Sequence, residues 1–131
     1  MKVGIIGLPQ TGKKRLFQLL TGMKTIHQAA DSSKAMTGVA EIHDPRFDVL
    51  AGMYNPRKTV RARIYIDFLP RLEASSIREG DVFRGIADVD ALGPVVRGFS
   101  NDAVYPVRGS VKPERDVDSV NAELILHDLL F

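Results

Sequence analysis

Apolar runs and apolar positions at helical spacing alternate along the chain. Val3, Ile5 and Ile6 form a run without polar alternation, which is typical of a parallel strand buried on both faces. A glycine-rich turn follows, and then apolar residues recur at helical spacing as far as Gly22, a suitable stop for a helix. These helical apolar positions are Leu16, Phe17, Leu19, Leu20 and Met23. The pattern predicts a strand, a turn and a helix in this first part of the chain.

The middle of the chain carries clear start and stop signals for a second helix. Residues 39–43 favour a strand. Asp44-Pro45 then combines a capping side chain with a proline at the first helical position, and Asn55-Pro56 ends the helix. The apolar face of this helix consists of Phe47, Leu50, Ala51 and Tyr54.

The clearest alternation of apolar and polar residues runs from Val60 to Ile66 and predicts a strand with Asp67 at its C-terminal end. Residues 92–97 favour a further strand, although the Gly-Pro pair within them weakens the pattern. A closing helix is expected over residues 113–131. Its apolar face consists of Val117, Val120 and Leu124.

Strands that alternate with helices predict an α/β fold with a mostly parallel sheet. Residues 24–36 and 70–80 are polar and predict loops, and residues 82–87 favour a short helix. Ligands of such folds bind beyond the carboxyl ends of the strands, where the glycine-rich turn and Asp67 are both expected.

Composition narrows the possible classes of protein. The chain has 131 residues, which corresponds to one domain, and 44% of them are hydrophobic and 26% charged. No apolar run approaches the roughly 20 residues that cross a membrane. The absence of cysteine excludes disulfides and zinc–thiolate sites and fits a cytoplasmic protein. The net charge of +2 is no strong sign of a nucleic-acid partner.

The turn after the first strand follows the phosphate-loop pattern G-x-x-x-x-G-K-[ST] at its first seven positions. Backbone N–H groups and a helix N-terminus attract phosphate in such a loop, and its lysine reaches the terminal phosphates. The alternative is an ordinary strand–helix turn with a capping glycine. The residues expected to hold phosphate are Gly7, Leu8, Pro9, Gln10, Thr11, Gly12, Lys13, Lys14 and Arg15.

The sequence departs from the pattern at its eighth position, where Lys14 stands in place of the Ser or Thr whose hydroxyl should contact Mg²⁺. An ammonium group has only donors and cannot bind a cation. Arg15 adds a further positive charge to a helix start where the dipole already disfavours it. The loop is therefore expected to accept an anion and to bind Mg²⁺ weakly or not at all. In the alternative interpretation, Lys14 and Arg15 point into solvent as a charged helix start.

Over nearly its whole length the sequence resembles the N-terminal part of the YchF-type translation-associated GTPases, relatives of Obg. The segments that carry the resemblance are 4–9, 12–13, 16–17, 37–39, 44–46, Asp67, 90–92, 95–97, Phe99, 101–102, 109–111, Asn121 and 123–126. The resemblance implies a P-loop NTPase fold of the G-domain type, binding of GTP or ATP, and a link to ribosomes.

The departures from the family fall on its chemistry. The family has Ser and Thr where this chain has Lys14 and Arg15, and its D-x-x-G switch motif ends here in Pro70, which has no N–H. Ser32 aligns roughly with the switch threonine that completes the metal shell, so the resemblance offers Ser32 and Asp67 as metal ligands. Asp67 is alternatively a polar strand terminus.

We therefore expect a single, partial P-loop domain over residues 1–131 that binds nucleotide with little or no hydrolysis. No N-K-x-D motif occurs in the chain, so binding should hardly distinguish ATP from GTP. The alternatives are a non-enzymatic module that meets the ribosome, RNA or a protein, and an NTPase completed by a partner. No membrane contact is expected. The strand at 92–97, as a sheet edge, and the apolar tip at 129–131 favour self-association.

Overall fold

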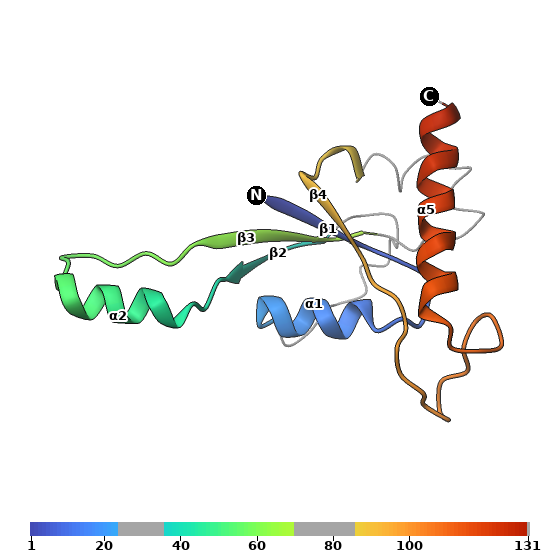
Figure 1. The fold of residues 1–131 in the computed structure, drawn as a ribbon, viewed down its shortest axis with the longest axis horizontal. Helices are drawn as coiled ribbons and strands as arrows, with labels where there is room; N and C mark the ends of the chain where they lie inside the picture. The colour runs from blue at the N-terminus through green and yellow to red at the C-terminus, as the bar shows by residue number, and fades with distance from the viewer. Residues whose placement is uncertain (24–35, 70–85, 131) are drawn as a thin grey trace.

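The computed structural model describes residues 1–23, 36–69 and 86–130, which form a four-stranded sheet and three helices. In chain order the elements are β1 (Lys2–Ile6), α1 (Lys13–Thr21), β2 (Met36–Glu41), α2 (Pro45–Tyr54), β3 (Arg63–Phe68), β4 (Ala91–Pro94) and α5 (Pro113–Leu130) (Figure 1). The strand order is β2-β3-β1-β4. β1 runs parallel to both of its neighbours, and β2 pairs antiparallel with β3. The expected α/β fold with a mostly parallel sheet is confirmed.

Adjacent residues of β1 build two separate parts of the core. Ile5 packs with Phe17 of α1 and Ile66 of β3, whereas Ile6 packs with Val120 of α5. All five side chains are at most 5% exposed. α1 and α5 consequently lie on different sides of the sheet (Figure 1). The run that predicted a strand buried on both faces is thus β1, the central strand, and its carboxyl end leads into the glycine-rich turn.

The strand boundaries differ from the sequence expectation because each strand extends only as far as its partner. β2 occupies 36–41 rather than 39–43, since it pairs with β3 from Phe68 back to Arg63. β3 begins at Arg63 rather than Val60, and β4 ends at Pro94 rather than residue 97. Single backbone hydrogen bonds continue both pairings beyond the strands, from Ile42 N to Ala62 O (2.9 Å) and from Val95 N to Ile6 O (2.8 Å).

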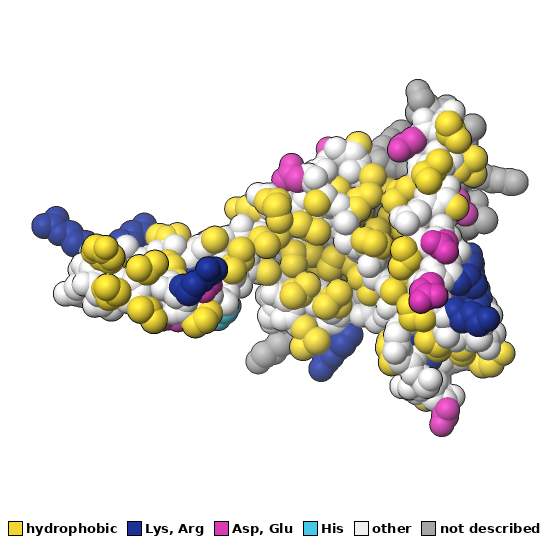
Figure 2. Space-filling view, viewed as in Figure 1, with side chains coloured by type: hydrophobic (Ala, Val, Ile, Leu, Met, Phe, Trp, Pro, Cys, Tyr) yellow, Lys and Arg dark blue, Asp and Glu magenta, His cyan; other side chains and the backbone are white. Residues whose placement is uncertain are grey.

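The second helix begins and ends where the sequence indicated, but nothing in the described structure buries it. The Asp44 carboxylate accepts a hydrogen bond from Arg46 N at 2.9 Å, and Asn55 closes the helix in the left-handed conformation. No α2 residue is buried, and Tyr54 is 78% exposed. α2 lies at the far end of an arm formed with the chain leading from β2 and into β3, and hydrophobic side chains gather on it (Figures 1 and 2). Of its apolar face, Leu50 and Tyr54 are therefore exposed and Phe47 and Ala51 are half-buried.

The cap of α2 should make the stability of this helix depend on pH. The side chain of Arg46, and then its backbone N–H, hold the pKa of Asp44 below the ordinary 3.8. The stabilisation by the ionised Asp44 cap is therefore fully present above the ordinary pKa of 3.8, and it is lost as the pH falls through the lower pKa of the folded state. We expect Asp44→Ala to speed amide exchange in α2 several-fold at pH 6 and to converge with the parent chain at strongly acidic pH. Asp118→Ala, an exposed aspartate of α5, is the control, and equal exchange in both variants at pH 6 would contradict the role of the cap.

Several expected features lie outside the described residues. These are the loops at 24–36 and 70–80, except Met36, most of the short helix at 82–87, Ser32, Pro70 and the last residue of the apolar tip. Within the described part of the chain, no helix is both long and apolar enough to cross a bilayer. β4 lies at one edge of the sheet, as expected for the last strand, and Leu129 is 78% exposed. Self-association stays a prediction.

Candidate phosphate-binding site

The turn between β1 and α1 is a tight loop whose conformation depends on glycine. Gly7 has φ 149°, Gln10 has φ 61° and Gly12 has φ 91°, so half of the residues from 7 to 12 have a backbone that disfavours side chains. A Cβ atom at Gly7 would lie 2.3 Å from the carbonyl oxygen of Val95. The first glycine of the motif is therefore needed both for its backbone angle and for the close approach of the β4 segment.

Lys13 holds its charge inside the loop. Its ammonium group donates a hydrogen bond to the carbonyl oxygen of Gly7 at 2.6 Å and lies 5.9 Å from the centre of the Phe68 ring. The residue is only 6% exposed. A cation that has been removed from water gains strongly from a nearby anion, because the local dielectric constant is low. The loop thus places a desolvated positive charge at the position that the motif assigns to phosphate.

In the first turn of α1, no side chain competes with such an anion for the free backbone N–H groups. Gly12 occupies the N-cap without a side-chain hydrogen bond, and the first turn contains no acidic residue. The uncapped N–H groups and the helix dipole both favour negative charge at this end. The Thr11 hydroxyl, in contrast, donates to the carbonyl oxygen of Leu8 at 3.1 Å and so supports the loop itself.

Lys14 and Arg15 follow on the outside of the helix, where both residues are exposed. Their exposure fits the alternative in which they form a charged helix start in solvent. Whether or not Lys14 points into solvent, the eighth position of the loop has no hydroxyl. Weak Mg²⁺ binding therefore stays a prediction.

Asp67 is 3% exposed, and other strands supply partners to both of its oxygens. Its Oδ1 accepts a hydrogen bond from the Thr37 hydroxyl at 2.6 Å, and its Oδ2 forms an ion pair with the Lys2 ammonium at 2.9 Å. The hydrogen bond to Asp67 raises the pKa of Lys2. Sequence reasoning missed both partners. The sheet register could have found them, because Asp67 lies opposite Thr37 in β2 and opposite Gly4, two residues from Lys2, in β1.

A metal role for Asp67 stays a prediction, because Ser32 lies outside the described residues. In the ranges 1–23, 36–69 and 86–130, no group of three or more histidine, aspartate and glutamate side chains is arranged to hold a metal ion.

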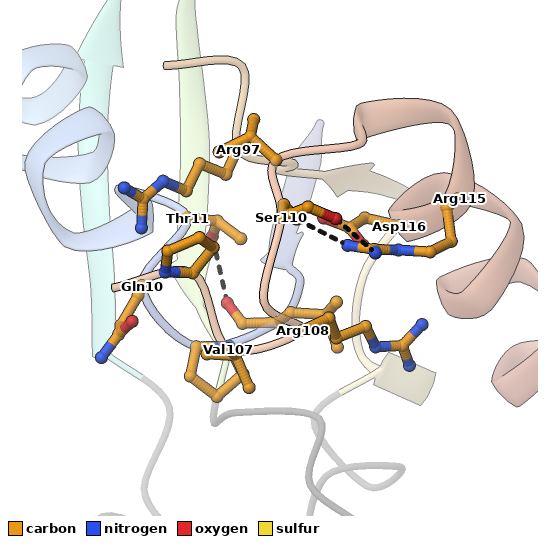
Figure 3. A pocket seen from close by; sticks show the side chains of 12 residues that line it. Gln10, Thr11, Arg97, Val107, Arg108, Ser110, Arg115 and Asp116 are labelled. Atoms are coloured by element: carbon orange, nitrogen blue, oxygen red, sulfur yellow. Dashed lines mark hydrogen bonds and ion pairs between the residues drawn. The ribbon is translucent and has the colours of Figure 1, made fainter. Parts of the chain in front are cut away.

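An open pocket lies between the loop and the chain that leads from β4 into the start of α5 (Figure 3). One wall consists of loop residues 8–11, and the other consists of Arg97, residues 106–108 and 110–111, and Arg115 and Asp116 of α5. Arg97 is 4% exposed and donates to the carbonyl oxygens of Phe99 (3.0 Å) and Val104 (2.7 Å). Sequence reasoning did not single out this pocket, since arginines scattered over three segments form no recognisable motif.

Comparison with known proteins gives related sequences and a related fold. The chain is 36% identical to the "Ribosome-binding ATPase YchF" of Pasteurella multocida (strain Pm70) and 34% identical to that of Bacillus subtilis (strain 168). Each match covers 98% of this chain and 37% of the relative. The solved Schizosaccharomyces pombe YchF GTPase superposes with a TM-score of 0.65 at 25% identity, over 98% of this chain and 36% of that structure. No protein-family model matches the chain. The chain spans about 37% of the length of these curated relatives.

Proposed function

Because this chain is related in sequence and in fold to the N-terminal region of the YchF-type P-loop proteins, we propose that it is a nucleotide-binding domain with little or no hydrolytic activity. Residues 7–15 hold the phosphates of ATP or GTP. The observation that carries the proposal is the buried Lys13 ammonium, held 2.6 Å from the Gly7 carbonyl oxygen at the uncapped start of α1. A helix start with that charge beside it favours a polyphosphate.

Weak hydrolysis follows from the missing metal ligand. Phosphoryl transfer depends on positioning and on Mg²⁺, which neutralises charge as the phosphates react. Mg²⁺ requires near-ideal octahedral geometry, so one lost ligand weakens it markedly. Lys14 supplies no oxygen, and Pro70 supplies no N–H at the switch position. Nucleotide is therefore retained by phosphate contacts without efficient cleavage.

Nucleotide binding should be nearly independent of the base. The sequence contains no N-K-x-D motif to bond the purine edge. Discrimination between bases arises from polar groups that the wrong base would leave unpaired. Phosphate contacts are common to ATP, GTP and tripolyphosphate, so these three ligands should bind with similar affinity.

The partner we propose is the ribosome, in a cytoplasmic setting, because the curated relatives are named ribosome-binding ATPases. The second candidate function is a non-enzymatic interaction module that meets ribosome, RNA or protein. The exposed arm favours it, since α2 has no buried residue and presents apolar side chains. Large exposed apolar patches are typical of interaction surfaces.

A thermal-shift experiment tests nucleotide binding. ATP, GTP and tripolyphosphate should each stabilise the chain, by about 2.7 kcal/mol at a concentration 100-fold above Kd, with little effect of Mg²⁺. Lys13→Met should abolish the shift, and Lys58→Met, an exposed lysine of the arm, should leave it unchanged. Absence of any shift would favour the interaction module. A tenfold preference for one purine, about 1.4 kcal/mol, would reveal a base pocket and contradict base-independent binding.

A further inference from the structure

Helix α2 carries a continuous stripe of exposed apolar side chains. The stripe consists of two adjacent positions and the two positions four residues further on, which lie on one side of a helix. Its members are Val49 (63% exposed), Leu50 (54%), Met53 (72%) and Tyr54 (78%). The helix lies on the arm that projects away from the sheet, where hydrophobic side chains gather (Figure 2). An apolar stripe of this kind is typical of a surface that binds a partner.

Helix α5 carries a second apolar stripe, on the side that faces away from the core. Its inner side packs on the sheet through Val120, which is 1% exposed, and through Leu124. The outer stripe follows the i, i+3, i+4, i+7 spacing of a separate helix face and consists of Ala122, Ile125 (60% exposed), Leu126 (51%) and Leu129 (78%). A helix with apolar residues on opposite sides is typically buried on both of them. The outer face of α5 therefore has the pattern of a surface that a partner covers.

The free end of the arm is positively charged. The two acids of the arm, Asp44 and Asp48, each form an ion pair with an arginine of the arm itself. Arg57 and Lys58, which follow the end of α2, are exposed and form no ion pair with another described residue. Figure 2 shows Lys and Arg side chains at this end of the molecule. The arm thus presents two uncompensated cations next to its apolar stripe.

Helix α5 has the opposite charge. It contains five acidic residues against a single arginine, and that arginine already pairs with Asp116 at 3.0 Å. Asp128 lies beside the outer stripe, and its side chain is 87% exposed. Complementary charges beside two apolar surfaces favour their association and select the partner. The outer face of α5 therefore matches the arm both in its apolar stripe and in the sign of its charge.

We propose that the chain forms a two-fold symmetric dimer, in which the arm of each copy docks on the outer face of the other copy's α5. The two surfaces lie at opposite ends of the molecule, so one copy cannot bring its own stripes together (Figure 1). Two-fold symmetry closes the assembly and contains the arm–α5 contact twice. This duplication is important, because a stable interface buries about 1,200 Å² or more. The proposal names a partner for the arm of the second candidate function and rests on no part of nucleotide binding.

Sedimentation equilibrium of the 131-residue chain over a range of concentrations tests the dimer. Met53→Glu places a negative charge in the arm stripe against the acidic helix, and Ile125→Lys places a positive charge in the α5 stripe against the basic arm. An unpaired charge inside an apolar contact should weaken each contact about tenfold, and hence the dimer, which contains two, about hundredfold. Leu19→Glu, at an apolar position of α1 that is 67% exposed, is the matched control and should associate as the parent does. All three positions are exposed, so circular dichroism should show an unchanged fold.

An equimolar mixture of Met53→Glu and Ile125→Lys identifies the two surfaces that meet. The first variant keeps an intact α5 and the second an intact arm, so a mixed pair regains one complete contact. The charges introduced at its other contact are opposite in sign. The mixture should therefore associate at least about tenfold more tightly than either variant alone.

Several results would overturn the proposal. A parent chain that is monomeric at every concentration would leave both stripes to a different partner, such as a ribosomal surface. Weakening by only one of the two variants would indicate an arm–arm or an α5–α5 contact, and weakening by neither would indicate pairing at the edge strand β4. Equal weakening by Leu19→Glu would reduce the association to nonspecific apolar contact. Lys13→Met should form the dimer as the parent does, so that a failure of nucleotide binding is distinguished from a failure of the dimer.

Discussion

Lys14→Ser is expected to make nucleotide binding depend on Mg²⁺ without making the chain an efficient hydrolase. The substitution removes a positive charge near the metal position and supplies the hydroxyl that the phosphate-loop pattern requires. We expect Mg²⁺ to tighten ATP binding about tenfold in this variant, or about 1.4 kcal/mol, and to leave the parent chain almost unchanged. Turnover should stay low because Pro70 still lacks the N–H of the switch glycine.

Lys14→Ala is the control that separates the charge from the hydroxyl. It removes the ammonium group as the serine variant does, but it offers no ligand to the metal. Calorimetry with and without Mg²⁺ measures the binding, and steady-state phosphate release measures the hydrolysis. We expect release by the parent chain to match that of Lys13→Met. Turnover clearly above that of Lys13→Met, or equal Mg²⁺ dependence in the serine and alanine variants, would refute the role assigned to position 14.

The parts of the fold that short-range signals control could be predicted from the sequence. The apolar run of β1, the Asp-Pro start of α2 and Gly22 at the end of α1 all act within a few residues. The turn between β1 and α1 belongs to this group, because the spacing of Gly7 and Gly12 in the sequence indicates where the strand ends and the helix begins; its binding of phosphate stays a prediction. Because these signals act within a few residues, tertiary contacts change the positions of such elements little.

The parts of the fold and of the site that could not be predicted depend on contacts between segments that are distant in the sequence. The strand ends follow pairing partners that the sequence does not reveal, and Lys2 meets Asp67 only because β1 and β3 are neighbours in the sheet. The pocket that Arg97 lines beside the loop likewise forms only because the segment after β4 folds back against the loop. Apolar spacing predicted helix α2 correctly, but spacing cannot tell whether an apolar face finds a partner, and no residue of α2 is buried in the described structure.

Gly7→Ala should be the most destabilising single methyl addition in the loop. The new Cβ would lie 2.3 Å from the Val95 carbonyl oxygen, a backbone atom that cannot turn aside as a flexible side chain can. The neighbouring hydrogen bond from Val95 N to Ile6 O holds the two segments together at 2.8 Å, so relief of the clash would strain the β1–β4 pairing. The φ of 149° adds a second cost, because it lies outside the range of ordinary side-chain-bearing residues.

Overpacking and backbone strain each cost about 1–3 kcal/mol, so we expect a combined loss of about 4 kcal/mol in urea unfolding. Such a loss is a large part of the roughly 5–15 kcal/mol that keeps a domain folded. Two controls divide the effect. Gly22 has φ 69° and no atom within 4 Å of the position that a Cβ would take, so Gly22→Ala should reveal the backbone cost alone, about 1 kcal/mol. Gly52 lies within α2 with open space around it, and Gly52→Ala should stabilise that helix by up to about 1 kcal/mol. If Gly7→Ala were no more destabilising than Gly22→Ala, the close contact with Val95 would not constrain the loop. Glycine would then be needed at position 7 only for its backbone angle.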